Sequence, residues 1–141
     1  MAFISISITK NHPLILGKGG FGRQLADWLS AEGWGEAEFL DDSAPGCVGG
    51  LRDYADPKLL KPGRPAFVAL GDNALRVELL QKLAAAGYDT PVFISDMAAV
   101  SPSAVLEPGC VILPQAYVGA DAHLGVGCII NGGAIVDHDA V

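Results

Sequence analysis

From residue 100 onward, large and small apolar residues recur every six positions. A large aliphatic residue begins each hexad, and a small residue follows four positions later. The large residues are Val100, Leu106, Ile112, Val118, Leu124, Ile130 and Val136, and the small ones are Ala104, Cys110, Ala116, Ala122, Cys128, Ala134 and Ala140. Neither the 3.6-residue period of a helix nor the two-residue period of a strand gives this spacing. The repeat predicts a parallel β-helix in which three hexads form one triangular coil and both residue classes stack inside.

The earlier part of the chain alternates short apolar runs with helical patterns. We expect strands at 14–16, 39–40, 66–70 and 91–94, and helices directly after the glycines at 17–22 and over 74–86. An alternation of isoleucine with serine or threonine around Ile4, Ile6 and Ile8 predicts one more half-buried strand. Strands that alternate with helices predict a parallel sheet. The expected fold is therefore an α/β Rossmann-like domain over residues 1–96, followed by a β-helix over residues 97–141.

Composition narrows the classes of protein that remain. Half of the 141 residues are hydrophobic and 18% are charged, which suffices for a folded core. A net charge of −7 argues against a nucleic-acid partner. No apolar run is long enough to span a membrane, no signal peptide is evident, and the three cysteines lack metal or redox spacing, so we expect no metal site and a cytoplasmic protein. The last hexad ends at Val141 without a polar cap, so we expect a fragment or a truncated protein.

The glycines at 17–22 form the pattern G-x-G-x-x-G between an expected strand and an expected helix. Such a turn lets the backbone and the helix amides approach a phosphate. Asp41 and Asp42 end the next strand, where an acid can accept hydrogen bonds from a ribose or a base. Gly71, Asp72 and Asn73 end the following strand, although they would equally suit a simple turn and helix cap. The predicted substrate-binding residues are Gly17, Gly19, Gly20, Phe21, Asp41, Asp42, Gly71, Asp72 and Asn73.

Five segments of the chain resemble the sugar acetyltransferases that include the sialic acid O-acetyltransferases and the bacterial nucleotide-aminosugar N-acetyltransferases. These segments are 17–22, 39–42, 69–73 with Arg76, 100–105 and, most specifically, 130–139. The resemblance covers the amino-terminal two-thirds of that family. It implies a front domain that binds a nucleotide-sugar, a left-handed β-helix that forms homotrimers, and acetyl-CoA in a cleft between neighbouring β-helices. Because later coils form most of that groove in the family, we expect the acetyl-CoA groove to be incomplete here.

The same resemblance implies that His138 is a general base and that Asp139 is its hydrogen-bond partner. His138 is the third residue of its hexad, so it should lie at a corner, outside the stack. Imidazole has a pKa suited to taking a proton from an attacking amine or hydroxyl, and a carboxylate of Asp139, or less favourably Asp137, would orient the ring. From the residues alone, a solvated turn histidine between two acids is the favoured interpretation of His138, and the resemblance reverses this in favour of the base. Arg76 is expected to be solvated.

The leading hypothesis is an acetyltransferase that moves an acetyl group from acetyl-CoA to an amino or hydroxyl group of a nucleotide-activated sugar. An alternative from another class is a module that binds the nucleotide-sugar and trimerises without chemistry. A nicotinamide oxidoreductase, suggested by G-x-G-x-x-G, ranks below both because a β-helix adds nothing to hydride transfer.

Overall fold

The computed structural model describes residues 12–141, so the strand expected around Ile4 to Ile8 lies outside the described residues. The front half contains β1 (Leu14–Leu16), α1 (Gly20–Ala31), β2 (Glu38–Leu40), the short 3-10 helix η1 (Asp53–Ala55), β3 (Ala66–Val68) and α2 (Asn73–Ala86). Two-residue strands follow: β4 (Phe93–Ile94), β5 (Ala99–Val100), β6 (Val105–Leu106), β7 (Val111–Ile112), β8 (Tyr117–Val118), β9 (His123–Leu124), β10 (Ile129–Ile130) and β11 (Ile135–Val136).

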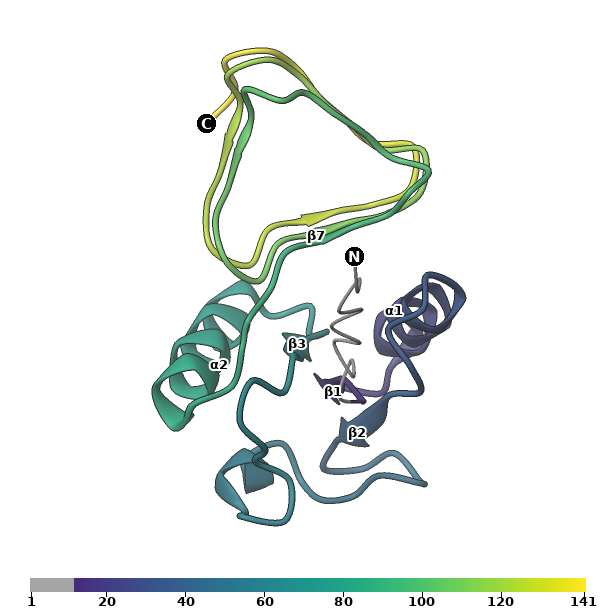
Figure 1. Cartoon of the computed structure of the whole chain (residues 1–141), viewed down its shortest axis with the longest axis vertical. Helices are drawn as coiled ribbons and strands as arrows, with labels where there is room; N and C mark the ends of the chain where they lie inside the picture. The colour runs from purple at the N-terminus through teal and green to yellow at the C-terminus, as the bar shows by residue number, and fades with distance from the viewer. Residues whose placement is uncertain (1–11) are drawn as a thin grey trace, which may run out of the picture.

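The front half is a parallel sheet with a helix on each face. Its strand order is β2-β1-β3, and every pairing is parallel. Leu14 and Leu16 face α2 and pack in one cluster with Leu79, whereas Ile15 faces α1 and packs in another with Leu25. Figure 1 shows α1 and α2 on opposite sides of β1 and β3. The expected α/β class is confirmed.

The strand expected at 91–94 does not belong to this sheet, which is a correction to the sequence-based prediction. The chain runs beside β3 only at a single bridge between Pro65 and Asp89, and then leaves it. β4 pairs instead with β7 of the β-helix. Val92 joins the interior of the β-helix, while Phe93 packs into the cluster between the two halves. An apolar run of four residues shows that a strand is buried but not which sheet it joins.

The β-helix, called the column below, is built as the six-residue repeat predicts. Paired strands lie eighteen residues apart, for example Phe93 beside Val111 and Val111 beside Ile129, so three hexads complete one coil. The three sides of the triangle in Figure 1 are the sheets β10-β7-β4, β11-β8-β5 and β6-β9. The interior cluster contains all the large residues of the hexads and all the small ones except Ala134 and Ala140, which are half-buried.

The corners of the column share one backbone conformation that the apolar pattern did not reveal. From residue 109 onward, every sixth residue has a positive φ: Gly109 (78°), Gln115 (63°), Asp121 (58°), Gly127 (71°), Gly133 (75°) and Asp139 (59°). Glycine adopts this left-handed region freely, and aspartate tolerates it better than most residues do. The backbone shape at Asp139 is therefore a general requirement of the column.

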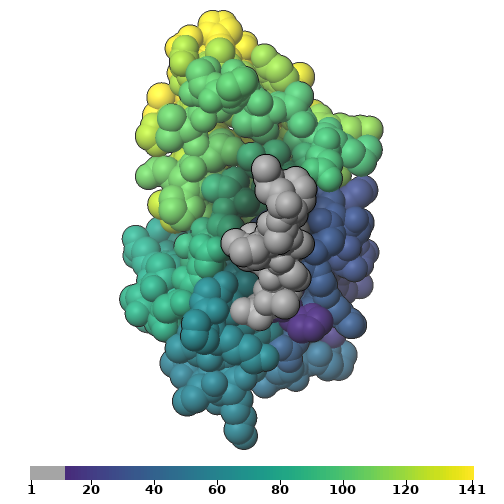
Figure 2. All heavy atoms as spheres, viewed as in Figure 1, coloured from purple at the N-terminus to yellow at the C-terminus, as the bar shows by residue number. Residues whose placement is uncertain are grey.

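One side of the column packs on the front half. Val111 and Leu113 lie in the same buried cluster as Ile15. Trp34 bridges the two halves edge-on, with ring centroids 5.7 Å from Phe67 and 6.3 Å from Phe93. Figure 2 shows the column, in green to yellow, at one end of an elongated molecule and the front half at the other.

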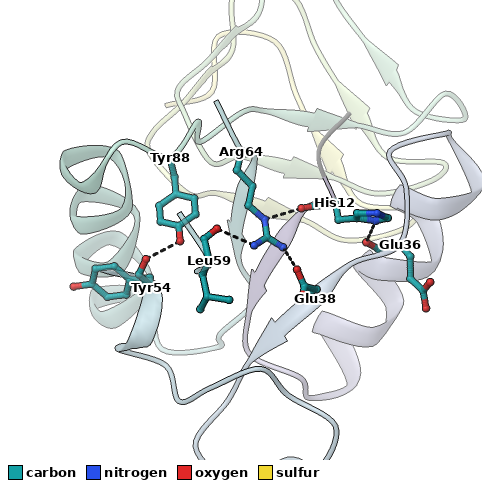
Figure 3. A network of polar contacts seen from close by, with 7 residues as sticks. All are labelled: His12, Glu36, Glu38, Tyr54, Leu59, Arg64 and Tyr88. Carbon is teal, nitrogen blue, oxygen red and sulfur yellow. Dashed lines mark hydrogen bonds and ion pairs between the residues drawn. The ribbon is translucent and has the colours of Figure 1, made fainter. Parts of the chain in front are cut away.

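A buried arginine ties the three strands of the front sheet together at their amino ends (Figure 3). Arg64 is only 1% exposed, and its guanidinium donates to the His12 and Leu59 carbonyl oxygens at 2.8 and 2.9 Å and to the Glu38 carboxylate at 2.6 Å. These residues precede or begin the strands. The carboxyl ends of the strands, where α/β proteins bind ligands, therefore lie at the opposite edge.

Candidate functional site

The glycine turn, residues 17–22, lies at the carboxyl end of β1, and its glycines serve two different purposes. Gly17 has φ +100°, and a methyl group there would lie 2.8 Å from the Ala69 carbonyl oxygen. A methyl group on Gly22 would clash with the Gly17 carbonyl oxygen. At Gly19 and Gly20 a methyl group would meet nothing within 4 Å. Two glycines thus let the strand and helix pack closely, and the other two leave open space in front of the turn.

That open space faces the start of α1. Gly19 is the residue before the helix, and no side chain caps the helix. By helix geometry, the amides of residues 20–22 have no acceptor inside the helix. Uncapped amides and the positive end of the helix dipole favour an anion. The arrangement fits the predicted phosphate-binding role of Gly19, Gly20 and Phe21.

Asp41 organises this turn through its carboxylate. Its oxygens accept hydrogen bonds from the backbone amides of Lys18 at 2.8 Å and of Ser43 and Ala44 at 2.9 Å. These bonds, the one from Lys18 foremost, lower the pKa of Asp41 from 3.8 to about 2. The Lys18 ammonium bends away to the Pro45 carbonyl oxygen at 2.7 Å. The structure thus gives Asp41 a local role, and contact with a ribose or base stays a prediction.

Asp42 is more open than Asp41. One of its oxygens accepts a single hydrogen bond, from the Leu51 amide at 2.9 Å. The exposed side chain borders a cavity of about 400 Å³ between η1 and α2, which is also lined by Gly50, Arg52 and Leu75. Its remaining acceptor capacity is available to a ligand.

The residues after β3 divide between a helix cap and the lining of a cavity. Asp72 caps α2, because its carboxylate accepts the Leu75 amide at 2.9 Å, as the capping alternative for this segment predicted. Gly71 and Asn73 instead border a cavity of about 310 Å³ where the front half meets the column. The full lining of this junction cavity is Phe21, Leu70, Gly71, Asn73, Arg76, Ile129 and Asn131. The structure therefore brings Phe21, Gly71 and Asn73 together.

Leu70, Arg76, Ile129 and Asn131 in this lining were not among the predicted site residues. The expectation that Arg76 is solvated is wrong: it is 8% exposed and donates at 2.8 Å to the carbonyl oxygens of Gly127 and Leu70 and to the Asn73 side chain. Arg76 lies four and seven residues before Leu80 and Leu83, so it shares their buried helix face. This spacing was the feature of the sequence that could have predicted the burial of Arg76.

The second candidate site is the His138 corner, residues 137–140, which follows β11. His138 Nδ1 lies 2.8 Å from Asp139 Oδ2, and the two side chains are 70% and 71% exposed. Asp137 accepts the His138 backbone amide at 2.8 Å. The hydrogen bond to Asp139, followed by the negative charges of Asp137 and Asp139, raises the pKa of His138 above 6.5. The ring lies outside the stack, and its hydrogen-bond partner is Asp139.

Within one chain the junction cavity and the His138 corner lie far from each other. The junction cavity borders the sheet β10-β7-β4, which faces the front half. The His138 corner joins the other two sides of the triangle, so it lies at the vertex opposite that sheet. In Figure 1 the yellow end of the chain lies at the vertex that points away from the front half.

Residues 12–141 contain neither a metal-binding cluster nor a helix that could span a membrane. In this described part of the chain, no group of three or more histidine, cysteine, aspartate or glutamate side chains is placed to hold a metal ion. No helix within the same residues has the length and apolar character needed to cross a membrane.

Comparison with known proteins gives consistent matches. The family model of the PglD N-terminal domain matches residues 14–83. The acetyltransferase domain of PglB from Neisseria gonorrhoeae FA1090 matches with a TM-score of 0.82 and 36% identity, over 92% of this chain and 66% of that one. The same domain in complex with acetyl coenzyme A gives 0.80 and 37% over the same shares. PerB from Caulobacter crescentus, in complex with CoA and GDP-perosamine, gives 0.81 and 32%, over 92% and 64%. A search of the curated proteins gave no match.

The matches extend through both halves of the molecule. The chain spans slightly less than two thirds of the length of these solved relatives. The relatives are acetyltransferases, and the Caulobacter protein is a GDP-perosamine N-acetyltransferase. An α/β front half that matches the PglD N-terminal domain is joined here, as in the relatives, to a column of hexads. The chain therefore belongs to the hexapeptide sugar acetyltransferase family.

Proposed function

We propose that the protein transfers an acetyl group from acetyl-CoA to an amino group, or less favourably a hydroxyl group, of a nucleotide-activated sugar. The observation that carries the proposal is the His138–Asp139 pair, 2.8 Å between Nδ1 and Oδ2, on the outer surface of the column. Its chemistry suits the reaction named for the relatives, one of which is crystallised with acetyl coenzyme A and another with CoA and GDP-perosamine.

The front half supplies the groups that would hold the nucleotide-sugar. The diphosphate would meet the amides at the start of α1, in the open space before Gly19 and Gly20. Asp42, with free acceptor capacity beside a second cavity, would receive hydrogen bonds from the ribose or the base. The sugar would enter the junction cavity, where Asn73 and Asn131 offer amide groups from opposite walls. Acceptor recognition thus uses residues that already lie together.

His138 would act as the general base of direct transfer. With Nδ1–H donated to Asp139, the ring presents Nε2 as its acceptor. Nε2 takes a proton as the acceptor nitrogen attacks the thioester carbonyl carbon, so that a C–N bond forms. The C–S bond then breaks, and the imidazolium returns the proton to the leaving thiolate of CoA. Asp139 stabilises the imidazolium between these two proton transfers.

The separation of the two sites bears on assembly. A substrate held in the junction cavity lies on the opposite side of the column from the His138 corner of the same chain. We therefore place the reaction between copies, with His138 of one copy meeting the acceptor held by another. In a cyclic homotrimer the His138 vertex of each column can face the neighbouring copy, and the same contact is repeated three times.

The direct test compares two exposed histidines of the column. His138→Ala should lower kcat at least about 100-fold, the lower range for loss of a general base. His123 is also exposed and lies 3.3 Å from the Glu107 carboxylate, so His123→Ala is the matched control. Release of the CoA thiol is measured with acetyl-CoA and a panel of nucleotide aminosugars. Equal turnover in the two variants would remove His138 as the base.

Mixing two inactive variants tests the arrangement between copies. Gly19→Glu places a negative charge in the open space of the glycine turn, where a Cβ atom added to Gly19 meets no protein atom within 4 Å. When His138→Ala and Gly19→Glu chains are co-assembled, some sites should combine an intact corner with an intact front half. Recovery of transfer activity is expected only for mixed assemblies. Mixed assemblies without any recovery would place both functions in one chain.

A binding module without catalysis is the alternative that the same separation favours. The groups that would hold the nucleotide-sugar are complete within one chain, whereas the His138 corner is exposed. Calorimetry with GDP- and UDP-linked sugars and with acetyl-CoA distinguishes the two. Binding of the nucleotide-sugar alone, without transfer, would support the module.

A further inference from the structure

We propose that Gly119 is a positioning residue that sets the place of His138 on the column. The inference rests on the proposed function, because it concerns the residue assigned there as the base. Gly119 follows β8 and lies one coil before the His138 corner. It has no side chain that could make a polar contact with that corner. Its contribution is the absence of a side chain.

The coil that carries His138 lies directly against Gly119. A methyl group there would lie 2.6 Å from the His138 backbone nitrogen, 2.9 Å from the Asp137 carbonyl carbon and 3.0 Å from the His138 Cα. All three atoms belong to the backbone, so no side-chain rotation could relieve the contact. Two backbone hydrogen bonds join the two coils on either side of this contact. The Gly119 amide donates to the Val136 carbonyl oxygen at 2.8 Å, and the Asp139 amide donates to the Ala120 carbonyl oxygen at 2.9 Å.

The position of the imidazole depends on this backbone because the ring has little else to hold it. Its side chain is 70% exposed, and its hydrogen-bond partner, Asp139, belongs to the same corner. A shift of the corner would therefore carry the pair together away from a thioester placed by other parts of the assembly. A displacement of about 1 Å is enough to lower a rate strongly.

Gly125 provides an internal comparison. It occupies the same position of the next hexad and, like Gly119, has no positive φ. A methyl group at Gly125 would lie 3.5 Å from the tip of the flexible Glu107 side chain, which is ordinary contact. The same hexad position holds Ser101, Glu107 and Leu113 in coils that pair with a following coil, so glycine there is not a general need of the column. At Gly119 the following coil is the one that carries His138, and there the backbone contact is tight.

The experiment compares Gly119→Ala with Gly125→Ala in the full chain. We expect Gly119→Ala to lower kcat at least tenfold with the KM values for both substrates within twofold, and to shift the backbone amide NMR signals of residues 137–139. Gly125→Ala should change neither. A kcat for Gly119→Ala within twofold of the parent would overturn the proposal, and so would complete loss of folding, because glycine would then serve the whole column.

A double variant separates positioning of His138 from a general defect. If Gly119 acts through His138, adding Gly119→Ala to His138→Ala should cause no further loss of the residual rate. A further tenfold loss would show an effect independent of the base and would contradict the proposal. If His138→Ala itself retains full activity, the proposed function fails first, and the NMR comparison still reports whether Gly119 sets the corner.

Discussion

The glycine turn and the His138 corner are the two candidate sites of this chain, and the structure holds them by different means. The turn is held by close packing on one side: Gly17 and Gly22 pack against backbone, and the Asp41 carboxylate accepts hydrogen bonds from three backbone amides. The corner is open, with His138 and Asp139 both about 70% exposed and hydrogen-bonded to each other. The proposed binding groups are thus held in place by the protein itself, whereas the proposed base is positioned mainly by the coil below it.

This difference separates two kinds of substitution. In the turn, changes to packing residues should cost stability and changes to open residues should cost binding. At the corner, changes should alter rate and pH dependence while the fold persists. The following predictions test that division.

The largest effect is expected at Gly22. Gly22→Ala places a methyl group against the Gly17 carbonyl oxygen, a backbone atom that cannot move without separating β1 from α1. Such overpacking should lower the free energy of unfolding by about 3 kcal/mol, measured by urea denaturation. Gly20→Ala in the same turn meets open space and should be neutral or slightly stabilising. Equal stabilities of the two variants would mean that the turn is not closely packed.

Gly19→Glu should instead affect binding. A Cβ atom at Gly19 meets nothing within 4 Å and the position precedes the helix, so the free energy of unfolding should change by less than about 1 kcal/mol. Because the negative charge would repel a phosphate at the start of α1, affinity for GDP or UDP should fall about 100-fold in calorimetry. Gly19→Ala is the size control and should bind nearly as well as the parent. Unchanged affinity of Gly19→Glu for GDP and UDP would show that the phosphates do not bind at this turn.

Asp139→Asn should change the pH profile at the corner. The hydrogen bond to Asp139 is the main cause of the raised pKa of His138, so the parent should lose activity on the acid side starting above pH 6.5. In Asp139→Asn the pKa of His138 falls toward 6.5, and the acid limb of kcat/KM moves to lower pH. We also expect the plateau rate to fall about tenfold as support for the imidazolium weakens.

Asparagine tolerates the positive φ of 59° at Asp139, so the corner should keep its shape. Asp121→Asn is the matched control, because Asp121 has the same backbone conformation, φ 58°, in another coil. An acid limb that stays in place in Asp139→Asn, or moves equally in Asp121→Asn, would contradict the pairing of Asp139 with the base.

The smallest effect is expected for Asp41→Asn. The amide nitrogen of asparagine would face the Lys18 N–H, and the charge would be lost, so we expect a cost of about 1 kcal/mol at pH 7 in this half-buried position. The pKa of Asp41 is lowered on folding to about 2, so its contribution is present above pH 4 and is lost as the pH falls from about 4 to 2. The stability difference between parent and variant should shrink in that window, measured by urea denaturation at each pH.

The sequence predicted the column almost completely and the junction poorly. A six-residue period fits few architectures. The position of a residue within its hexad therefore predicted whether it stacks inside the column or lies at a corner. The positive φ at Gln115, Asp121 and Asp139 did not, because residues other than glycine give no clear signal for this conformation.

The errors at the junction share a physical cause. The run at 91–94 was assigned to the wrong sheet, and Arg76 was expected in solvent. In both cases the missing information was which distant segment lies alongside, and local patterns do not contain it. The glycine turn was located correctly, but only the structure separated packing glycines from open ones. The pairing of His138 with Asp139 was expected, whereas its distance from the junction cavity was not.

The contact between α2 and the column restricts which changes in length the chain can accept. Leu80 lies against Gly109 and Gly127, two corners eighteen residues apart, and so fixes the angle at which the column stands on the front half. Six residues inserted between β4 and β7 would turn everything after them by a third of a revolution and carry Asn131 away from the cavity. Eighteen inserted residues would leave each later residue on its original side of the column and would lengthen the column by only one strand spacing, about 4.8 Å. Natural insertions within such columns should therefore come in whole coils.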